Sequence, residues 1–192
     1  MMTIAAQVNS PTIMPRAAAS EFERFVVLFD RLVEESGQWL RHVPAERLEW
    51  TPPTDRGVHF GSRLRHASIK TLLVHMGIAE RFWIERLKDC SDGALLPLPR
   101  DMNAFHAALD GDFLKNLTDL HTESMAILKT MSHDQLQVRV KFAGDGTEWT
   151  VMGFLWGLWG HRAYHLGNLD MLVRTLCGNA PDFFSFNQQE MA

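Results

Sequence analysis

The sequence predicts an all-α protein built as a four-helix bundle. Apolar residues recur at spacings of three and four over four long stretches, and only one short segment alternates as a strand does. Amphipathic helices of this kind bury their apolar faces against one another. At 192 residues and 46% hydrophobic content, the chain can form one domain with a sizeable core. We expect this bundle at residues 18–178, with a mobile tail at 1–17 and a second tail at 179–192.

The first two helices are predicted at residues 20–43 and 68–90. Ser20 followed by Glu23 is a capping-box pattern, which marks the start of the first helix. Turn residues and two prolines in residues 49–61 indicate a loop between the two helices. The second helix carries an apolar stripe that consists of Leu72, His75, Met76, Ala79, Phe82, Trp83 and Leu87.

A long crossover follows the second helix, because residues 91–93 and two nearby prolines end it. The third helix begins near Asn103, is interrupted at residues 110–112 and then continues to about Met131. This long crossover disfavours a simple up-down-up-down bundle. Alternation over residues 138–142 and the glycines that follow predict a small hairpin or extended loop. The last helix is then expected to begin at the cap Thr150 and to end before Gly178.

Composition excludes several classes of partner. The net charge is −4 and the basic residues are scattered, so we expect no nucleic-acid partner. No apolar run approaches the roughly 20 residues of a membrane span, and the first residues lack the pattern of a secretory signal. Cys90 and Cys177 lie far apart without CxxC spacing and are expected to be buried, reduced thiols. These features together predict a cytoplasmic protein with no membrane partner.

The last helix carries two histidines within its core-facing row. Side chains at positions i and i+4 lie one turn apart on the same face, so His161 and His165 can both reach one point in the interior. A metal ion can be bound in this way, although nine histidines in such a chain give roughly 0.4 HxxxH pairs by chance. Followed in steps of three and four, the row consists of Val151, Phe154, Leu158, His161, His165, Leu169, Leu172 and Leu176.

His75 strengthens the pattern, because it also falls on an apolar stripe, between Leu72 and Ala79. A lone buried histidine is more often a hydrogen-bonded core residue than a ligand. Three buried histidines on two helices would each need partners in the core, whereas one cation can satisfy a nitrogen on all three. We therefore predict a metal site formed by His75, His161 and His165. The remaining histidines lie in polar or loop contexts and are expected to be solvated: His42, His59, His66, His106, His121 and His133.

Three stretches resemble the DinB family of bacterial damage-inducible-type proteins, also called DinB/YfiT-like proteins. Residues 71–83 (TLLVHMGIAERFW) resemble the family helix that carries a histidine, a small residue, an acid and aromatics. Residues 161–168 (HRAYHLGN) resemble its HxxxHxGQ motif, and residues 147–150 (TEWT) resemble the segment before its last helix. The likeness spans roughly residues 20–178. One departure is Asn168, which stands where the family has glutamine.

The resemblance implies a bundle in which the three matching histidines bind a divalent ion, commonly nickel or zinc, with water completing its coordination. These roles fall on His75, His161 and His165. Some relatives are thiol-dependent transferases or isomerases that act with mycothiol, bacillithiol or glutathione-like thiols. A small thiol or another small substrate is therefore the expected partner. Because such bundles often dimerise, we also expect a homodimer.

The sequence leaves three functions open. A metal-dependent enzyme could activate bound water as a hydrolase, or a bound thiol as a transferase or isomerase. A non-catalytic bundle could use the metal for structure or dimerisation, and a metal-free bundle could hydrogen-bond its histidines to one another. Glu80 is a candidate helper near His75, but an exposed helix glutamate is an equal interpretation. For Tyr164, and for most of the six tryptophans, core packing is the simpler interpretation.

Overall fold

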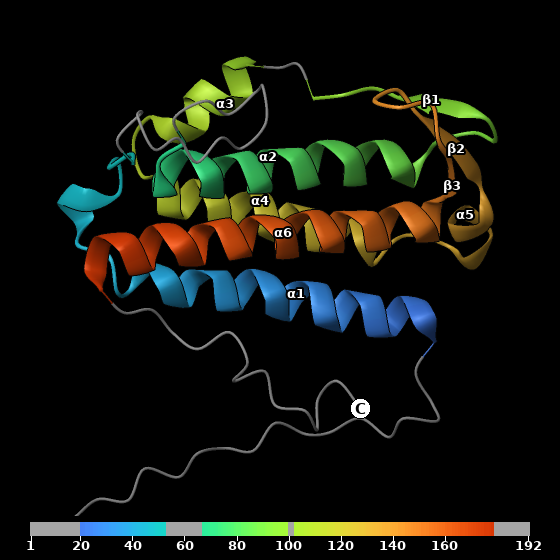
Figure 1. Cartoon of the computed structure of the whole chain (residues 1–192). Coiled ribbons are helices and arrows are strands. Elements are labelled where there is room, and N and C mark those ends of the chain that lie inside the picture. Colours follow the sequence, from blue (N-terminus) through green and yellow to red (C-terminus); the bar gives the residue numbers. More distant parts are fainter. Residues whose placement is uncertain (1–19, 53–66, 100–101, 179–192) are drawn as a thin grey trace, which may run out of the picture.

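Four long helices lie side by side in the computed structural model, which describes residues 20–52, 67–99 and 102–178 (Figure 1). The predicted tails, His59, His66 and most of the predicted loop at 49–61 lie outside these residues. The four helices are α1 (Glu21–Leu40), α2 (Ile69–Lys88), α4 (Phe113–Leu128) and α6 (Val151–Cys177). The predicted all-α four-helix bundle is confirmed.

In the bundle, α1 and α2 occupy opposite corners. Each of them packs against both α4 and α6. Figure 1 shows that α2 and α4 run in one direction, while α1 and α6 run in the other. The chain must therefore return along the bundle between α2 and α4, and the predicted crossover does this through a short helix, α3 (Met102–Leu109). As predicted, the bundle is not a simple up-down-up-down arrangement.

Capping residues mark the starts of α1 and α6, and a glycine ends α6, at the positions that the sequence indicated. Glu23 accepts a hydrogen bond from the backbone of Ser20 at 2.7 Å, and the Ser20 hydroxyl accepts one from the backbone of Glu23 at 3.2 Å. At the start of α6, the Thr150 hydroxyl accepts from the backbone N–H of Gly153 at 3.0 Å. Gly178 ends that helix with φ of 78°, a left-handed conformation that glycine adopts without steric cost.

A three-stranded sheet covers one end of the bundle (Figure 1). The predicted hairpin consists of β2 (Arg139–Phe142) and β3 (Glu148–Thr150), which pair antiparallel. The strand β1 (Ala94–Leu96) was not predicted; it pairs parallel to β2. Three residues are too few to show alternation, so tertiary pairing alone defines this strand. Two other short elements, α5 (His133–Gln137) and the 3-10 helix η1 (Ala45–Arg47), were also not predicted.

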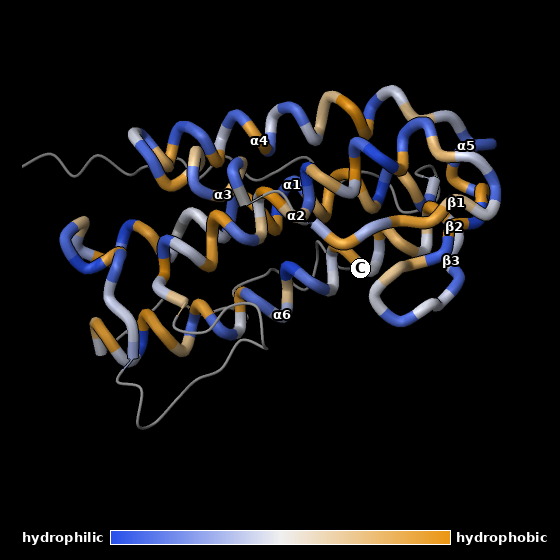
Figure 2. The backbone as a smooth tube through the Cα atoms, turned by 90° about the horizontal axis from the view of Figure 1, so that it is seen from above, coloured by the Kyte–Doolittle hydropathy of each residue, from blue (hydrophilic) through white to orange (hydrophobic). Residues whose placement is uncertain are grey.

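The core consists of two apolar clusters, one toward the sheet and one toward the opposite end. Hydrophobic and hydrophilic residues alternate along each helix (Figure 2). On α2 and α6, polar residues with very low exposure mark the junction of the two clusters: Glu80, Arg162 and His165. None of the described helices is both long and apolar enough to span a membrane. The unusual feature of this core is therefore its polar layer, which includes one of the predicted metal ligands, His165.

Candidate metal centre

The structure brings His75, His161 and His165 together in the seam between α2 and α6. Their side-chain nitrogens that could bind a metal all lie within 4.8 Å of one another. His161 and His165 lie one turn apart on α6, and His75 faces them from α2, which packs against α6. His165 is only 5% exposed, whereas His75 and His161 are half-buried. The cluster is therefore anchored in the core but reaches the solvent on one side.

The spacing of the nitrogens matches what one metal ion requires. The Nε2 atoms of His161 and His165 are 3.1 Å apart. Two nitrogens that each lie about 2.0–2.1 Å from one zinc ion are roughly 2.8–3.4 Å apart for angles between 90° and tetrahedral. The ring of His75 lies 5.3 Å from that of His161 and 5.0 Å from that of His165, measured between centroids. A 3.1 Å separation also suits an N–H···N hydrogen bond between the two imidazoles. This distance is therefore compatible with both the metal-bound and the metal-free interpretation.

Both histidines of α6 are neutral at pH 7. Burial lowers the pKa of His161 to about 3, with smaller effects from His165, His75 and Arg162. Burial likewise lowers the pKa of His165 to about 4, with smaller effects from His75 and Arg162. A neutral imidazole has a free nitrogen lone pair, which is the form that binds a metal. The low pKa values therefore keep these side chains in the ligand form.

The pKa shifts predict that the metal-free protein loses stability in mild acid. The unfolded chain takes up protons on His161 and His165 near pH 6.5, whereas the folded chain resists this until about pH 3–4. Their contribution to the free energy of unfolding is therefore present above pH 6.5 and is lost as the pH falls toward 4. The expected slope is at most about 1.4 kcal/mol per pH unit for each imidazole. Urea unfolding between pH 7 and pH 5 in a chelator measures it.

The matched controls for that experiment are His161→Gln and His133→Gln. The first variant should show a shallower loss of stability with falling pH, because it removes one buried imidazole. The second should behave like the natural chain, because His133 is exposed. Equal pH slopes for all three proteins would contradict the assignment of the acid sensitivity to the buried histidines.

Aromatic rings flank the cluster on two sides. Trp83 lies edge-on to His161, with centroids 6.0 Å apart and planes at 87°. The Trp83 ring is itself fixed, because its Nε1 donates to the backbone oxygen of Pro97 at 3.0 Å. Tyr164 contacts His165, with centroids 5.2 Å apart. The sequence interpretation of Tyr164 as a packed residue is wrong, since it is 63% exposed and forms part of the surface beside the cluster.

Two solved structures share this arrangement of helices. YfiT from Bacillus subtilis, described as a probable metal-dependent hydrolase with an unusual four-helix bundle topology, is 16% identical. The match has a TM-score of 0.58 and covers 85% of this chain and 93% of YfiT. A DinB-like protein from Bacillus subtilis, YjoA, is 15% identical, with a TM-score of 0.60 and coverage of 83% and 96%. No family model and no curated protein matches the sequence.

The chain has the DinB-like fold. At 15–16% identity the likeness establishes the fold alone. What the histidine cluster does within this fold must be argued from the residues around it.

Asn168 marks a departure from the DinB-like sequence pattern beside the cluster. It follows His165 by three residues and His161 by seven, so it lies on the same face of α6. Its Nδ2 atom is buried and has no hydrogen-bond partner among the described residues. The buried Nδ1 atoms of His161 and His165 also lack one. Metal-binding histidines usually donate this nitrogen's proton to a carboxylate or carbonyl group, and none of the described residues takes that role for His161 or His165.

Glu80 and Arg162 form a buried ion pair that was not predicted from the sequence. The two carboxylate oxygens of Glu80 accept from Nε and Nη2 of Arg162, each at 2.7 Å. Nη1 of Arg162 donates to the Ser36 hydroxyl at 2.9 Å, so α1, α2 and α6 are joined. Glu80 is 3% exposed, and the interpretation of it as an exposed glutamate is wrong. It binds Arg162 rather than an imidazole.

A signal for this ion pair was present in the sequence. Arg162 occupies an apolar row of α6, one turn from Leu158 and Leu166, where a charged residue needs a buried partner. The partner could not be identified, because Glu80 is 82 residues away in the chain. Two adjacent residues of α6 therefore belong to different polar clusters: His161 lies in the histidine cluster, and Arg162 forms the ion pair with Glu80.

The predictions for the remaining histidines and for the two cysteines are confirmed only in part. His42, His106 and His133 are exposed, as expected. His121 differs, because it is part-buried and its Nε2 lies 2.7 Å from Oδ1 of Asp30. The two cysteines are free but half-buried rather than buried: Cys90 and Cys177. Burial raises the pKa of the Cys90 thiol, so this thiol is protonated at neutral pH.

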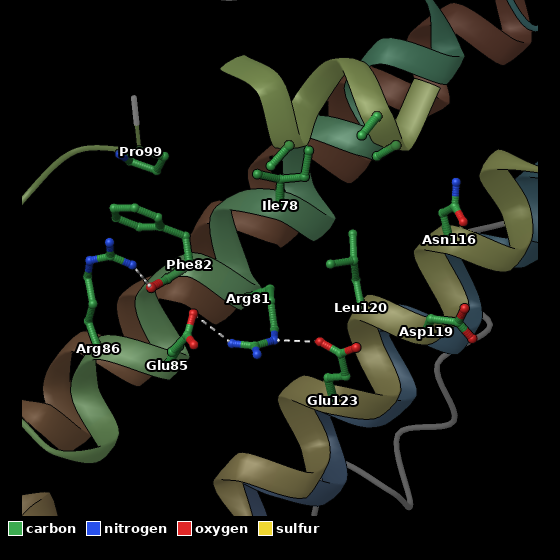
Figure 3. Close-up of a pocket in the computed structure, with 13 residues that line it drawn as sticks. Ile78, Arg81, Phe82, Glu85, Arg86, Pro99, Asn116, Asp119, Leu120 and Glu123 are labelled. Atoms are coloured by element: carbon green, nitrogen blue, oxygen red, sulfur yellow. Dashed lines mark hydrogen bonds and ion pairs between the residues drawn. The ribbon is translucent and has the colours of Figure 1, made fainter. Parts of the chain in front are cut away.

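Two cavities lie away from the three histidines. The first, of about 540 Å³, lies among α2, α3 and α4, and Figure 3 shows its lining. Three of its charged residues are paired with one another, because Arg81 bridges Glu85 at 3.1 Å and Glu123 at 3.0 Å. The second, of about 470 Å³, opens between α1 and α4. None of the three clustered histidines lines either cavity.

Proposed function

We propose that this protein binds one divalent transition metal through His75, His161 and His165, and that it is a metal-dependent enzyme that activates a bound water or thiol. The observation that carries the proposal is the cluster of three imidazoles whose ligand atoms lie within 4.8 Å of one another. Two of the three imidazoles are neutral at pH 7 because burial lowers their pKa. The resemblance to DinB proteins supports nickel or zinc as the ion.

The composition of the ligand set favours activation of a fourth ligand. An imidazole that binds a metal carries no charge, so three of them leave the full charge of a dication uncompensated, and the positive charge of Arg162 is already balanced by Glu80. A three-histidine site keeps a coordination position open, where the ion would lower the pKa of a bound water or thiol. His75 and His161 are half-buried, so the cluster is not fully enclosed by the core. An anionic fourth ligand is the one this site stabilises.

The description of YfiT as a probable metal-dependent hydrolase supports the water-activating form. The DinB resemblance supports the thiol-activating form equally. In both forms Trp83 and Tyr164 would form the walls of the substrate site, since their rings contact His161 and His165. The expected substrate is therefore a small molecule with an apolar portion that can lie against these rings.

Activity with two classes of substrate tests the enzyme proposal. Protein purified without a nickel column and loaded with one equivalent of zinc or nickel is assayed with an activated ester, and separately with a small thiol plus an electrophile. We expect turnover in one of the two assays, and its loss in His75→Ala. The control is His106→Ala, which changes an exposed histidine and should keep full activity. Full metal content without turnover in either assay would leave the non-catalytic bundle as the function.

A further inference from the structure

The cavity between α1 and α4 is lined by polar groups that the proposed metal centre does not use. It has a volume of about 470 Å³, within the range of small-molecule sites. Exposed residues form its rim, among them Glu34, Thr118 and Thr122, so it is open to solvent. Its floor is the buried pair of Glu80 and Arg162. The cavity therefore extends from the surface to the polar layer of the core.

The hydroxyl groups that line this cavity present acceptors rather than donors. Each of them donates its proton to the backbone carbonyl four residues earlier, at distances of 2.8 to 3.0 Å. A hydroxyl that has used its single proton can offer only oxygen lone pairs to a ligand, and on Ser36 one of these already accepts from Nη1 of Arg162 at 2.9 Å. The four hydroxyls belong to Ser36, Thr118, Thr122 and Ser124.

The imidazole of His121 adds an acceptor to the same wall. Its Nε2 lies 2.7 Å from Oδ1 of Asp30, and its buried Nδ1 has no hydrogen-bond partner among the described residues. When Nε2 donates its proton to the Asp30 carboxylate, Nδ1 carries a lone pair. An acceptor of this kind fits a ligand that brings N–H groups.

The charges around this cavity are unbalanced. The carboxylates of Asp30, Glu34 and Glu80 line it together with one guanidinium, that of Arg162, so these four groups carry a formal charge of −2. Glu80 and Arg162 neutralise each other, so the surplus lies with Asp30 and Glu34 on α1. The cavity of Figure 3 differs, because Arg81 there is paired with Glu85 and Glu123, and Asp119 is paired with Lys115.

We infer that the cavity between α1 and α4 binds a small organic cation, namely a primary alkylamine. An ammonium group has three donors and no acceptor, which complements a wall of acceptors with surplus negative charge. The alkyl part would pack against the apolar side of the cavity, formed by Val33, Leu40, Leu73 and Leu117. A metal ion is a poorer match, since among the described residues only the three histidines form a group that could hold one.

Titration calorimetry with three matched probes tests the inference. The probes are butylamine, butyrate and 1-butanol, which share an alkyl chain and are cationic, anionic and neutral at pH 7. We expect saturable binding of butylamine that is at least about tenfold tighter than that of the other two, because charge-assisted hydrogen bonds form only with the ammonium. Equal binding of all three probes, or no binding of butylamine, would overturn the inference.

Variants place the bound amine in the cavity. Glu34→Gln removes one rim charge and should weaken butylamine binding several-fold, and Asp30→Asn should do the same. Glu35→Gln is the matched control, because Glu35 lies on the same helix but does not line the cavity. Gly37 lines the cavity, and apart from its chain neighbours and its own helix backbone no described atom lies within 4 Å of where a Cβ would stand, so Gly37→Leu should fill the space and block binding. Unchanged binding in all three cavity variants would contradict the placement.

The proposals of a metal centre and of an amine site can be tested independently of each other. His161→Ala is expected to keep full butylamine binding, because His161 does not line this cavity. Circular dichroism melts of each variant confirm that it is folded before its binding is compared. Loss of butylamine binding in folded His161→Ala would show that the amine binds at the histidine cluster, and the cavity assignment would then be wrong.

Discussion

The His161→Ala variant is expected to contain no metal, whereas the natural chain, purified without a nickel column, contains about one equivalent. His161 contributes one of three nitrogens that lie within 4.8 Å of one another, and its Nε2 is 3.1 Å from that of His165. A site that loses one of three ligands no longer encloses the ion, and the two remaining imidazoles cannot replace it. Elemental analysis of both proteins measures the difference directly.

The same variant should also lose the stabilisation that the metal provides. A metal that binds only the folded chain raises its stability, by about 4 kcal/mol when the free metal is a thousandfold above the dissociation constant. Adding a chelator should therefore lower the melting temperature of the natural chain but leave that of His161→Ala unchanged. The control is His133→Ala, an exposed position that should keep both metal and chelator sensitivity. Full metal content in His161→Ala would show that the ion is held elsewhere.

The parts of the fold that the sequence predicted are those set by long periodic patterns. The four helices could be located because each presents several turns of apolar residues, and caps such as Thr150 fixed their ends. The strand β1 has no such pattern, since its three residues are defined by pairing with β2. Short elements depend on tertiary contacts that local spacing does not encode.

In the proposed site, too, helical periodicity predicted some features, whereas contacts between helices could not be predicted. His161 and His165 could be placed on one face because they lie on one helix, and the position of His75 on an apolar stripe predicted that it faces the interior. The pairing of Glu80 with Arg162 could not be predicted, because helical periodicity places a residue on a face but does not name its partner on another helix. For the same reason His121 was expected in solvent, whereas it contacts Asp30.

Replacing Arg162 by methionine is expected to lower the free energy of unfolding by about 3–5 kcal/mol, the usual effect of leaving one partner of a buried ion pair uncompensated. The Glu80 carboxyl would remain in a position that is 3% exposed, after losing both of its 2.7 Å hydrogen bonds. Urea denaturation measures the change. The matched control is Arg174→Met, which removes an exposed arginine from the same helix and should change stability by less than about 1 kcal/mol.

The double variant Glu80→Met/Arg162→Met separates stability from alignment of the metal site. Replacing a buried ion pair by apolar residues of similar volume often restores stability, so most of the loss should be recovered. The bidentate contact is nevertheless gone, and it joins α2, which carries His75, to α6, which carries His161 and His165. We therefore expect the double variant to bind zinc more weakly than the natural chain although it is nearly as stable. Zinc binding as tight as in the natural chain would limit the ion pair to a role in stability, since helix packing alone would then suffice to hold the three histidines in register.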